Sequence, residues 1–273
     1  MQYKRVTSMF FSPTGGTERM TKTVAEALGR ELGLPVTHSS FTLPQERETP
    51  RAFTAEDIVV IGTPVYAGRV PNVLLKYLAT IRGGGAAAVP VVAFGNRAYD
   101  DALTELRDIM TDAGCKAAGA GAFVCAHVFS ETLGAGRPDE TDLALARDLA
   151  QGVARKLEAR PLPEEPLRVR GRERADRVYF QSKDLEGKPV SILKVKPQTG
   201  ESCTNCGFCA TVCPVGAIDP DDVRKFRTFC IKCCACIKKC PQHARYFDDP
   251  GFISHLREIE RTHARRAQSE IFV

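Results

Sequence analysis

Two stretches of the chain repeat one cysteine pattern. They are Cys203-Thr-Asn-Cys206-Gly-Phe-Cys209-Ala-Thr-Val-Cys213-Pro214 and Cys230-Ile-Lys-Cys233-Cys234-Ala-Cys236-Ile-Lys-Lys-Cys240-Pro241. Both read C-x2-C-x2-C-x3-C-P and align without a gap, and of the 11 cysteines only Cys115 and Cys125 lie outside positions 203–240. A disulfide scaffold would spread its cysteines through a short secreted chain, so this clustering indicates a metal-binding domain.

The spacing distinguishes two kinds of metal site. Three cysteines at steps of three can place thiolates on three irons of a 4Fe-4S cluster, while the fourth iron takes a ligand from elsewhere. Structural zinc is the alternative, but zinc sites usually pair two C-x2-C motifs. A triplet followed by Cys-Pro, present twice, therefore favours two 4Fe-4S clusters. Cys234 is surplus and stands where the first repeat has Gly207; we interpret it as a packed residue, with a redox or alternative-ligand role left open.

Residues 190–250 resemble bacterial two-cluster ferredoxins, which are small α+β domains. The resemblance implies one-electron transfer, and it implies that the fourth cysteine of each run ligates the other cluster. One cluster would be held by Cys203, Cys206, Cys209 and Cys240, and the other by Cys230, Cys233, Cys236 and Cys213.

Residues 1–160 alternate short apolar runs with segments of helical period, a pattern that predicts βαβ units around a parallel sheet. We expect strands at Val6–Phe11, Pro35–His38, Ile58–Ile61, Val89–Phe94 and Gly121–Ala126. Helices are expected to end before Gly33, to run from Pro71 to Gly83, to end before Gly114, and to cover Leu145–Leu157. The predicted fold is α/β, a doubly wound five-stranded parallel sheet in the order 2-1-3-4-5.

The loop Phe11-Ser12-Pro13-Thr14-Gly15-Gly16-Thr17 follows the first strand and opens a helix. Its hydroxyls and glycine amides can contact an anion at the helix N-terminus, although such turns also simply cap helices. Neither the P-loop nor the dinucleotide fingerprint occurs here. The loop therefore favours a monophosphate over a triphosphate with magnesium.

Two more loops end the third and fourth strands, at residues 62–71 and 94–100. In a doubly wound sheet all three loops converge on one crevice at the switch point. On these loops and this strand pattern, residues 1–160 resemble the flavodoxin family. The resemblance implies FMN, with its phosphate on Ser12, Thr14, Gly15, Gly16 and Thr17, one side of its ring on Pro64, Val65, Tyr66, Ala67, Gly68 and Arg69, and its pyrimidine edge on Gly95, Asn96, Arg97, Tyr99 and Asp100.

Several residues near this crevice keep two interpretations. Many flavodoxins place a tryptophan against the ring, and this chain has none, so Tyr66 and Tyr99 are either aromatic substitutes or packing residues. Arg69 and Arg97 either balance a reduced anionic flavin or face solvent. His127 is either structural or close to the flavin. No catalytic constellation of the hydrolase type is visible.

The pattern of strands and helices stops at Arg160, and 161–166 reads as a stiff, exposed connector. We expect a linker over 161–189, with a charged tail that can form a helix over 251–273. The arginine-rich stretch 168–177 is either a solvated face or a docking segment for a partner.

The order of the domains resembles that of flavodoxin–ferredoxin fusion proteins. It implies electron transfer between FMN, two 4Fe-4S clusters and a redox partner protein: a ferredoxin, a reductase or a metalloenzyme. Two alternatives stay open, an FMN-dependent reductase of a small organic electron acceptor, and a flavin-free ferredoxin with a docking domain. Whether the chain is an enzyme therefore stays open as well.

Charge and hydropathy bear on partners and location. The chain carries a formal charge of +5, which two clusters and one phosphate would bring to about −1, and this removes the main support for nucleic-acid binding. No signal peptide is recognisable, and no apolar run reaches the length of a membrane span. We expect a cytoplasmic protein.

Overall fold

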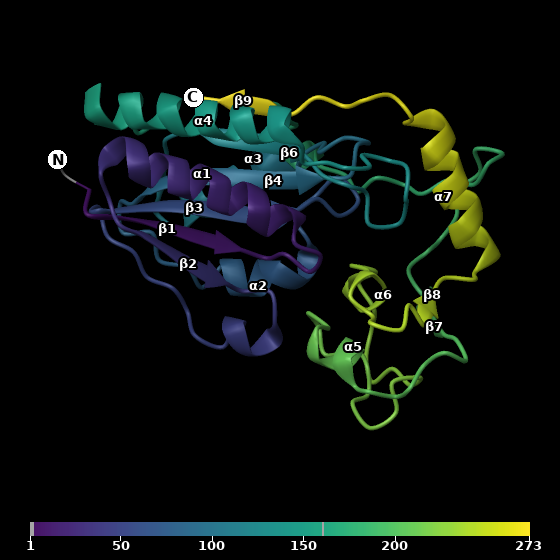
Figure 1. Cartoon of the computed structure of the whole chain (residues 1–273). Coiled ribbons are helices and arrows are strands. Elements are labelled where there is room, and N and C mark those ends of the chain that lie inside the picture. The colour runs from purple at the N-terminus through teal and green to yellow at the C-terminus, as the bar shows by residue number, and fades with distance from the viewer. Residues whose placement is uncertain (1–2, 160) are drawn as a thin grey trace.

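The computed structural model describes residues 3–159 and 161–273. Arg160, where the sequence predicts the domain boundary, lies outside the described residues, as do the first two residues of the predicted 1–160 domain. The first half contains a sheet in the order β2-β1-β3-β4-β6-β9, with β5 also paired to β4 (Figure 1). Its strands are β1 (Arg5–Phe10), β2 (Val36–Ser40), β3 (Asp57–Pro64), β4 (Ala87–Phe94), β5 (Lys116–Ala117), β6 (Ala120–Val124) and β9 (Glu270–Phe272).

The central strands β3 and β4 are almost entirely buried because helices cover both faces of the sheet. Along one face, α1 and α4 contribute Met20, Val24, Leu149 and Val153 to an apolar core. On the other, α2, α3 and the turn η2 bury their own apolar side chains. The helical elements of this half are α1 (Gly16–Leu32), η1 (Pro44–Arg47), η2 (Asn72–Leu74), α2 (Leu75–Leu78), α3 (Ala102–Asp112) and α4 (Glu140–Ala159).

The expected parallel core, in the order 2-1-3-4-5, is confirmed by β2, β1, β3, β4 and β6. Two strands were not expected: the two-residue β5 and the antiparallel β9. Both are too short to show a hydrophobic period. The helix expected from Pro71 to Gly83 is also shorter, because the backbone of Arg82 pairs with that of Arg51 and Phe53 and leaves the helical path.

The cysteine-rich half contains little regular structure. Its elements are β7 (Gln198–Thr199), α5 (Phe208–Thr211), α6 (Ala235–Lys238), β8 (Arg245–Tyr246) and α7 (Pro250–Thr262), with β7 and β8 paired antiparallel. The two repeats fold alike: α5 follows Gly207 at φ 77°, and α6 follows Cys234 at φ 61°. Cys234 therefore adopts the left-handed conformation that favours glycine, and it is buried.

The segment between the two halves runs along α3 and includes the turn η3 (Arg174–Asp176). Arg177 pairs with Asp108, and Arg174 pairs with Asp112 at 2.9 Å. Arg107 of α3 donates to the carbonyl of Leu167 at 2.6 Å. The arginine-rich stretch thus contacts acidic groups of its own chain instead of forming only a solvated face.

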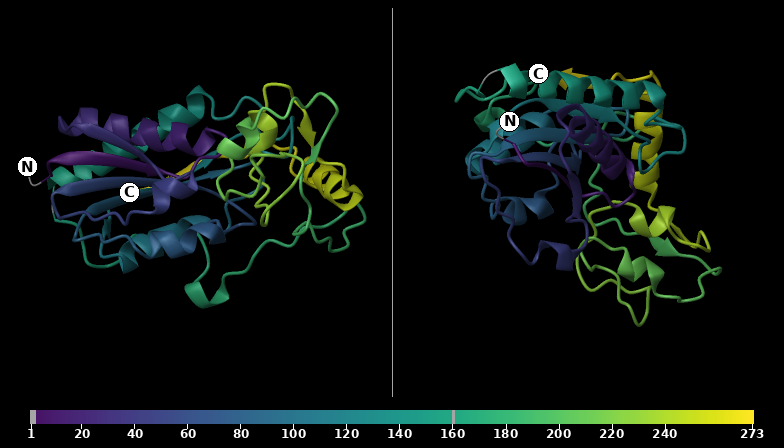
Figure 2. Two further views of the ribbon diagram at one scale, coloured as in Figure 1. Left: turned by 90° about the horizontal axis from the view of Figure 1, so that it is seen from below. Right: turned by 60° about the vertical axis from the view of Figure 1, so that its left-hand side comes forward.

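The cysteine-rich half lies at the carboxyl ends of the sheet strands and is attached at both of its ends (Figure 2). After α7 the chain returns to the sheet, where Asn96 donates to the carbonyls of His263 and Arg265 at 2.8 and 2.7 Å. The expected C-terminal tail therefore comprises α7 and the edge strand β9. Within the part of the chain that the structure describes, no helix combines the length and apolarity needed to cross a bilayer.

Candidate functional site

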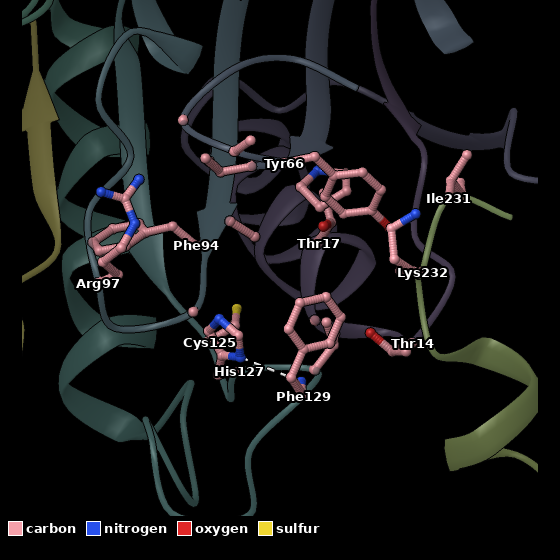
Figure 3. Close-up of a pocket in the computed structure, with 18 of the residues that line it drawn as sticks. Thr14, Thr17, Tyr66, Phe94, Arg97, Cys125, His127, Phe129, Ile231 and Lys232 are labelled. Atoms are coloured by element: carbon pink, nitrogen blue, oxygen red, sulfur yellow. Dashed lines mark hydrogen bonds between the residues drawn. The ribbon is translucent and has the colours of Figure 1, made fainter. Parts of the chain in front are cut away.

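A cavity of about 1710 Å³ lies between the carboxyl ends of the strands and the cysteine-rich half (Figure 3). The three loops that the sequence identified meet in its wall. Of the candidate flavin residues, those that line it are Thr14, Gly15, Gly16, Thr17, Pro64, Val65, Tyr66, Ala67, Gly68, Gly95 and Arg97. The convergence follows from the parallel sheet, because parallel strands end at one edge.

The first loop has the features of an anion-binding turn. Gly15 adopts φ 96° directly before α1, which brings backbone amides of the first helical turn toward the cavity. Thr14 and Thr17 point hydroxyl groups into this end of the cavity. Ser12 lies behind the loop instead, where its hydroxyl accepts a hydrogen bond from the amide of Glu18 at 2.9 Å. The helix terminus, hydroxyls and glycine backbone fit a phosphate group.

The second loop is a tight turn in which the backbones of Tyr66 and Arg69 exchange two hydrogen bonds, of 2.9 and 3.1 Å. It exposes the Tyr66 ring to the cavity centre (Figure 3). Burial raises the pKa of the Tyr66 phenol well above its usual value, and the nearby thiols of Cys233, Cys234 and Cys230 act in the same direction. Tyr66 therefore stands between the cavity and the second cysteine run.

Five candidate flavin residues do not line the cavity: Ser12, Arg69, Asn96, Tyr99 and Asp100. Arg69 forms a bidentate pair with Glu105 at 2.6 and 2.8 Å. Asn96 binds the C-terminal segment, and Asp100 pairs with Arg97. Tyr99 packs on Phe94 and donates its hydroxyl proton to Glu270 at 2.6 Å. Of the two tyrosines weighed from the sequence, Tyr66 faces the cavity and Tyr99 is a packing residue.

Apart from His127, which was considered as a residue close to the flavin, much of the cavity wall comes from segments that the sequence alone did not assign to the cavity. They are the β6–α4 loop, the segment before the cysteine runs and the second run itself, contributing Val128, Phe129, Ser130, Glu131, Tyr179, Phe180, Gln181, Ser182, Phe229, Ile231 and Lys232. The length of the β6–α4 loop was one available signal, because long loops in compact domains are often functional. The other two segments reach the cavity only through the tertiary fold.

His127 lies in the wall formed by the β6–α4 loop. Its Nδ1 accepts a hydrogen bond from the amide of Phe129 at 3.2 Å, so the neutral ring carries its proton on Nε2. A Cβ atom on Gly95 would lie 2.4 Å from the Cδ2 atom of His127, so only glycine fits there. Burial, together with the positive charge of Arg97 and Lys238 and the neighbouring His255 and His263, lowers the pKa of His127 to about 4.

This lowered pKa predicts a pH-dependent stability. Between the unfolded value of 6.5 and about 4, the unfolded chain binds more protons, so the contribution of His127 is complete above pH 6.5 and is lost as the pH falls toward 4. The full loss is at most about 3 kcal/mol. Urea unfolding of His127→Gln should therefore depend less on pH across this window than that of the unchanged protein. His38→Gln, an exposed site on β2, is the control; equal slopes for all three proteins would contradict the prediction.

The cysteines form two groups, and each combines residues of both runs. A small pocket is lined by Cys203, Cys206 and Cys209 of the first run and Cys240 of the second. The other group is Cys230, Cys233 and Cys236 with Cys213, which lie within electrostatic reach of one another. In the described residues, no three His, Cys, Asp or Glu side chains are arranged to hold a single metal ion. A 4Fe-4S cluster does not require that arrangement, because each of its four thiolates contacts a different iron.

The donor set suits iron–sulfur clusters. Backbone amides donate to the cysteine sulfurs at equivalent places in the repeats: Ala217 to Cys213 at 3.2 Å, and Ala244 to Cys240 at 3.4 Å. Such N–H···S bonds stabilise thiolates in the environment of a cluster. Burial raises the pKa of Cys233 and Cys236 to about 12, so these thiols must lose protons when they bind metal.

The two cysteine groups differ in position. Cys230 lines the large cavity. The next two residues, Ile231 and Lys232, line it as well (Figure 3). We call the group of Cys213, Cys230, Cys233 and Cys236 the inner group. The outer group, of Cys203, Cys206, Cys209 and Cys240, does not line the cavity, and its Cys206 is exposed.

Fold and site together define a chain that joins a flavodoxin-like α/β domain to a cysteine-rich 4Fe-4S dicluster domain. Residues 168–258 match a family model described as a 4Fe-4S dicluster domain. No curated protein matches the chain.

Solved structures similar to the first half include flavodoxins. A flavodoxin from Streptococcus pneumonia TIGR4 has 22% identity and a TM-score of 0.38, with 55% of this chain and 98% of that chain covered. Two-electron reduced flavodoxin from Megasphaera elsdenii has 15% identity and a TM-score of 0.38, with 55% and 98% covered. Flavodoxin 2 from Bacillus cereus has 13% identity and a TM-score of 0.40, with 56% and 99% covered.

Proposed function

We propose that the chain passes electrons between a bound FMN and two 4Fe-4S clusters, and from there to a redox partner. The observation that carries the proposal is the position of Cys230, which belongs to the inner cysteine group and also lines the cavity formed by the flavin loops. A cofactor in the cavity and a cluster on the inner group would be neighbours. FMN, when bound, can hold one or two electrons, whereas each cluster passes one.

The residues of the cavity have distinct roles in this proposal. Thr14, Thr17 and the backbone of Gly15 and Gly16 bind the phosphate. Tyr66 packs against the ring system. Arg97 lines the cavity, and its guanidinium, which pairs with Asp100, lies 3.9 Å from the centre of the Phe180 ring.

The cluster ligands are assigned as the sequence resemblance implies. Cys203, Cys206, Cys209 and Cys240 hold the outer cluster, and Cys230, Cys233, Cys236 and Cys213 hold the inner one. The outer cluster is the exit toward a partner, because Cys206 is exposed and Phe208 beside it is 42% exposed. An apolar ring at the surface next to a cluster suits transient protein docking.

Anaerobic reductive titration of the purified chain tests the proposal. We expect about four electrons per chain, two into the flavin and one into each cluster, together with a flavin band in the visible spectrum. About two electrons and no flavin band would contradict FMN binding and would favour a ferredoxin on a docking domain.

A matched pair of variants tests whether FMN binds at the phosphate loop. Gly15 has φ +96° and Gly187 has φ +79°, and an added Cβ atom would contact nothing within 4 Å at either position. Valine is strained at both, but only Gly15 lies in the phosphate loop. Gly15→Val should lower the affinity for FMN at least tenfold and Gly187→Val should leave it unchanged; equal flavin occupancy in the two variants would contradict the assignment.

The cavity volume favours a second candidate function, reduction of a small organic acceptor. Pockets for drug-sized ligands measure about 300–1,000 Å³, and this cavity is about 1710 Å³. The space beside a flavin would be lined by His127, Phe129 and Phe180. Rapid reoxidation of the reduced protein by a quinone, slowed in His127→Gln, would support this function, and equal rates in the two proteins would contradict it.

A further inference from the structure

Arg245 is a buried cation that lines the small pocket of the outer cysteine group. It lies in β8 and is 3% exposed. Because the repeats align without a gap, Arg245 of the second repeat corresponds to Ile218 of the first. One repeat thus places a guanidinium where the other places an apolar side chain.

The contacts of Arg245 leave most of its guanidinium without a partner. Its Nη1 donates to the carbonyl of Val223 at 2.8 Å and lies 3.7 Å from the sulfur of Cys209. The guanidinium carbon is 5.4 Å from the centre of the Phe226 ring. The Nε and Nη2 atoms are buried and have no hydrogen-bond partner, carboxylate or other, in the described part of the chain. An unpaired buried cation is costly unless negative charge lies nearby.

The charge of an iron–sulfur cluster meets this requirement. A 4Fe-4S cluster held by four thiolates is anionic, and its reduction adds one negative charge. Cluster potentials depend on net charge and on hydrogen bonds to the sulfurs. A cation beside the cluster stabilises the added charge, so it raises the reduction potential.

The placement of Arg245 is asymmetric. Its direct sulfur contact is Cys209, a member of the outer group. Ile218, the equivalent residue, packs in an apolar cluster that includes one cysteine of each group, Cys209 and Cys236, and it carries neither a charge nor a side-chain N–H. In the described part of the chain, only the outer group receives an N–H from Arg245.

We propose that Arg245 raises the reduction potential of the outer cluster above that of the inner cluster. With both clusters bound, an electron would pass from the reduced inner cluster to the oxidised outer one, leaving the inner cluster oxidised and the outer cluster reduced, with no proton transferred. The electron would then be held by the outer cluster, next to the exposed Cys206. The inference rests on the two clusters and the ligand assignment proposed above, and it does not require FMN.

Redox titration followed by electron paramagnetic resonance tests this inference on the full chain. Arg245→Met should shift the reduction equilibrium of the outer cluster at least tenfold toward the oxidised state, which is 59 mV for one electron. The inner cluster should shift less. Arg245→Lys, which keeps the charge, should stay within threefold of the unchanged protein. Lys225→Met removes one exposed charge of the same domain and should shift neither cluster by more than threefold.

The outer cluster is recognised as the signal that is altered in Cys240→Ser. The proposal is overturned if Arg245→Met and Lys225→Met shift the potentials equally, or if the larger shift belongs to the other signal. If Arg245→Met loses iron, Arg245→Gln replaces it, because glutamine keeps a donor without the charge. Loss of iron in the Met, Gln and Lys variants alike would assign Arg245 a structural role and overturn the proposal as well. A missing flavin band would leave these outcomes unaffected.

Discussion

Replacement of Cys240 by serine is expected to damage the cluster whose other three ligands belong to the first cysteine run. Cys240 lies in the second run, but it lines the same pocket as Cys203, Cys206 and Cys209. The iron content should fall from about eight to about four atoms per chain, or the damaged cluster should remain with fewer than four irons. Iron analysis and the electron paramagnetic resonance spectrum of the reduced protein measure this effect.

Two further variants make the result specific. Cys213→Ser should damage the inner cluster, which gives the opposite pattern of surviving signals. Cys234→Ser should retain both clusters, because Cys234 is not one of the proposed ligands, and its buried side chain donates only a weak hydrogen bond to the carbonyl of Lys232. Loss of the same signal in Cys240→Ser and Cys213→Ser would show that the fourth cysteine of each run does not ligate the cluster held by the other run.

Loss of the Asp142 carboxylate is expected to have the largest effect on the stability of the first domain. Arg137 and Asp142 form a bidentate ion pair whose side chains are 4% and 1% exposed. Burial raises the pKa of Asp142, but hydrogen bonds from Arg137, Ser269 and the amide of Asp139 outweigh it, so that the pKa is lowered overall. Arg137 also donates to the carbonyl of Ala267 at 3.2 Å. The pair joins the β6–α4 loop, α4 and the C-terminal segment.

Asp142→Ala removes the bidentate partner of the buried Arg137 guanidinium, which among the described residues keeps only Asp139 at 3.7 Å and the carbonyl of Ala267. Breaking a buried pair in this way costs about 3–5 kcal/mol. The urea midpoint of the far-ultraviolet circular dichroism signal should fall accordingly. Glu140→Ala is the control, because the Glu140 carboxylate is 77% exposed and pairs with Arg147 at the surface; its loss should cost less than about 1 kcal/mol. Similar midpoints for both variants would show that the buried pair does not stabilise the fold.

The sequence carries the parts of the site that depend on local spacing. The cysteine runs and the turn before α1 are short patterns, and the structure brings the residues of each together. Tyr66 and Tyr99 both follow strand ends, so their spacing alone did not separate a cavity residue from a packing residue. Their hydrogen-bond partners distinguish the two tyrosines. Glu270, which accepts the hydrogen bond of the Tyr99 hydroxyl, comes from the far end of the chain.

The rest of the site depends on contacts between distant segments. Phe180 and Lys232 line the cavity because the segment between the two halves of the chain runs along α3, where Arg177 pairs with Asp108. This path places the cysteine-rich half over the ends of the strands. The three residues of β9 carry no periodic signal of their own; they form a strand because the edge of β6 is available. Arg245 looks like an ordinary charged residue until its burial is known.

The return of the chain to the sheet through β9 has a kinetic consequence. Because the cluster domain is tethered before its first cysteine and again after its last, the two halves stay together at any protein concentration. Electron exchange between them should be a first-order process whose rate is insensitive to dilution. Only the step to an outside partner should be second-order, so stopped-flow traces at several protein concentrations would separate the internal step from the external one.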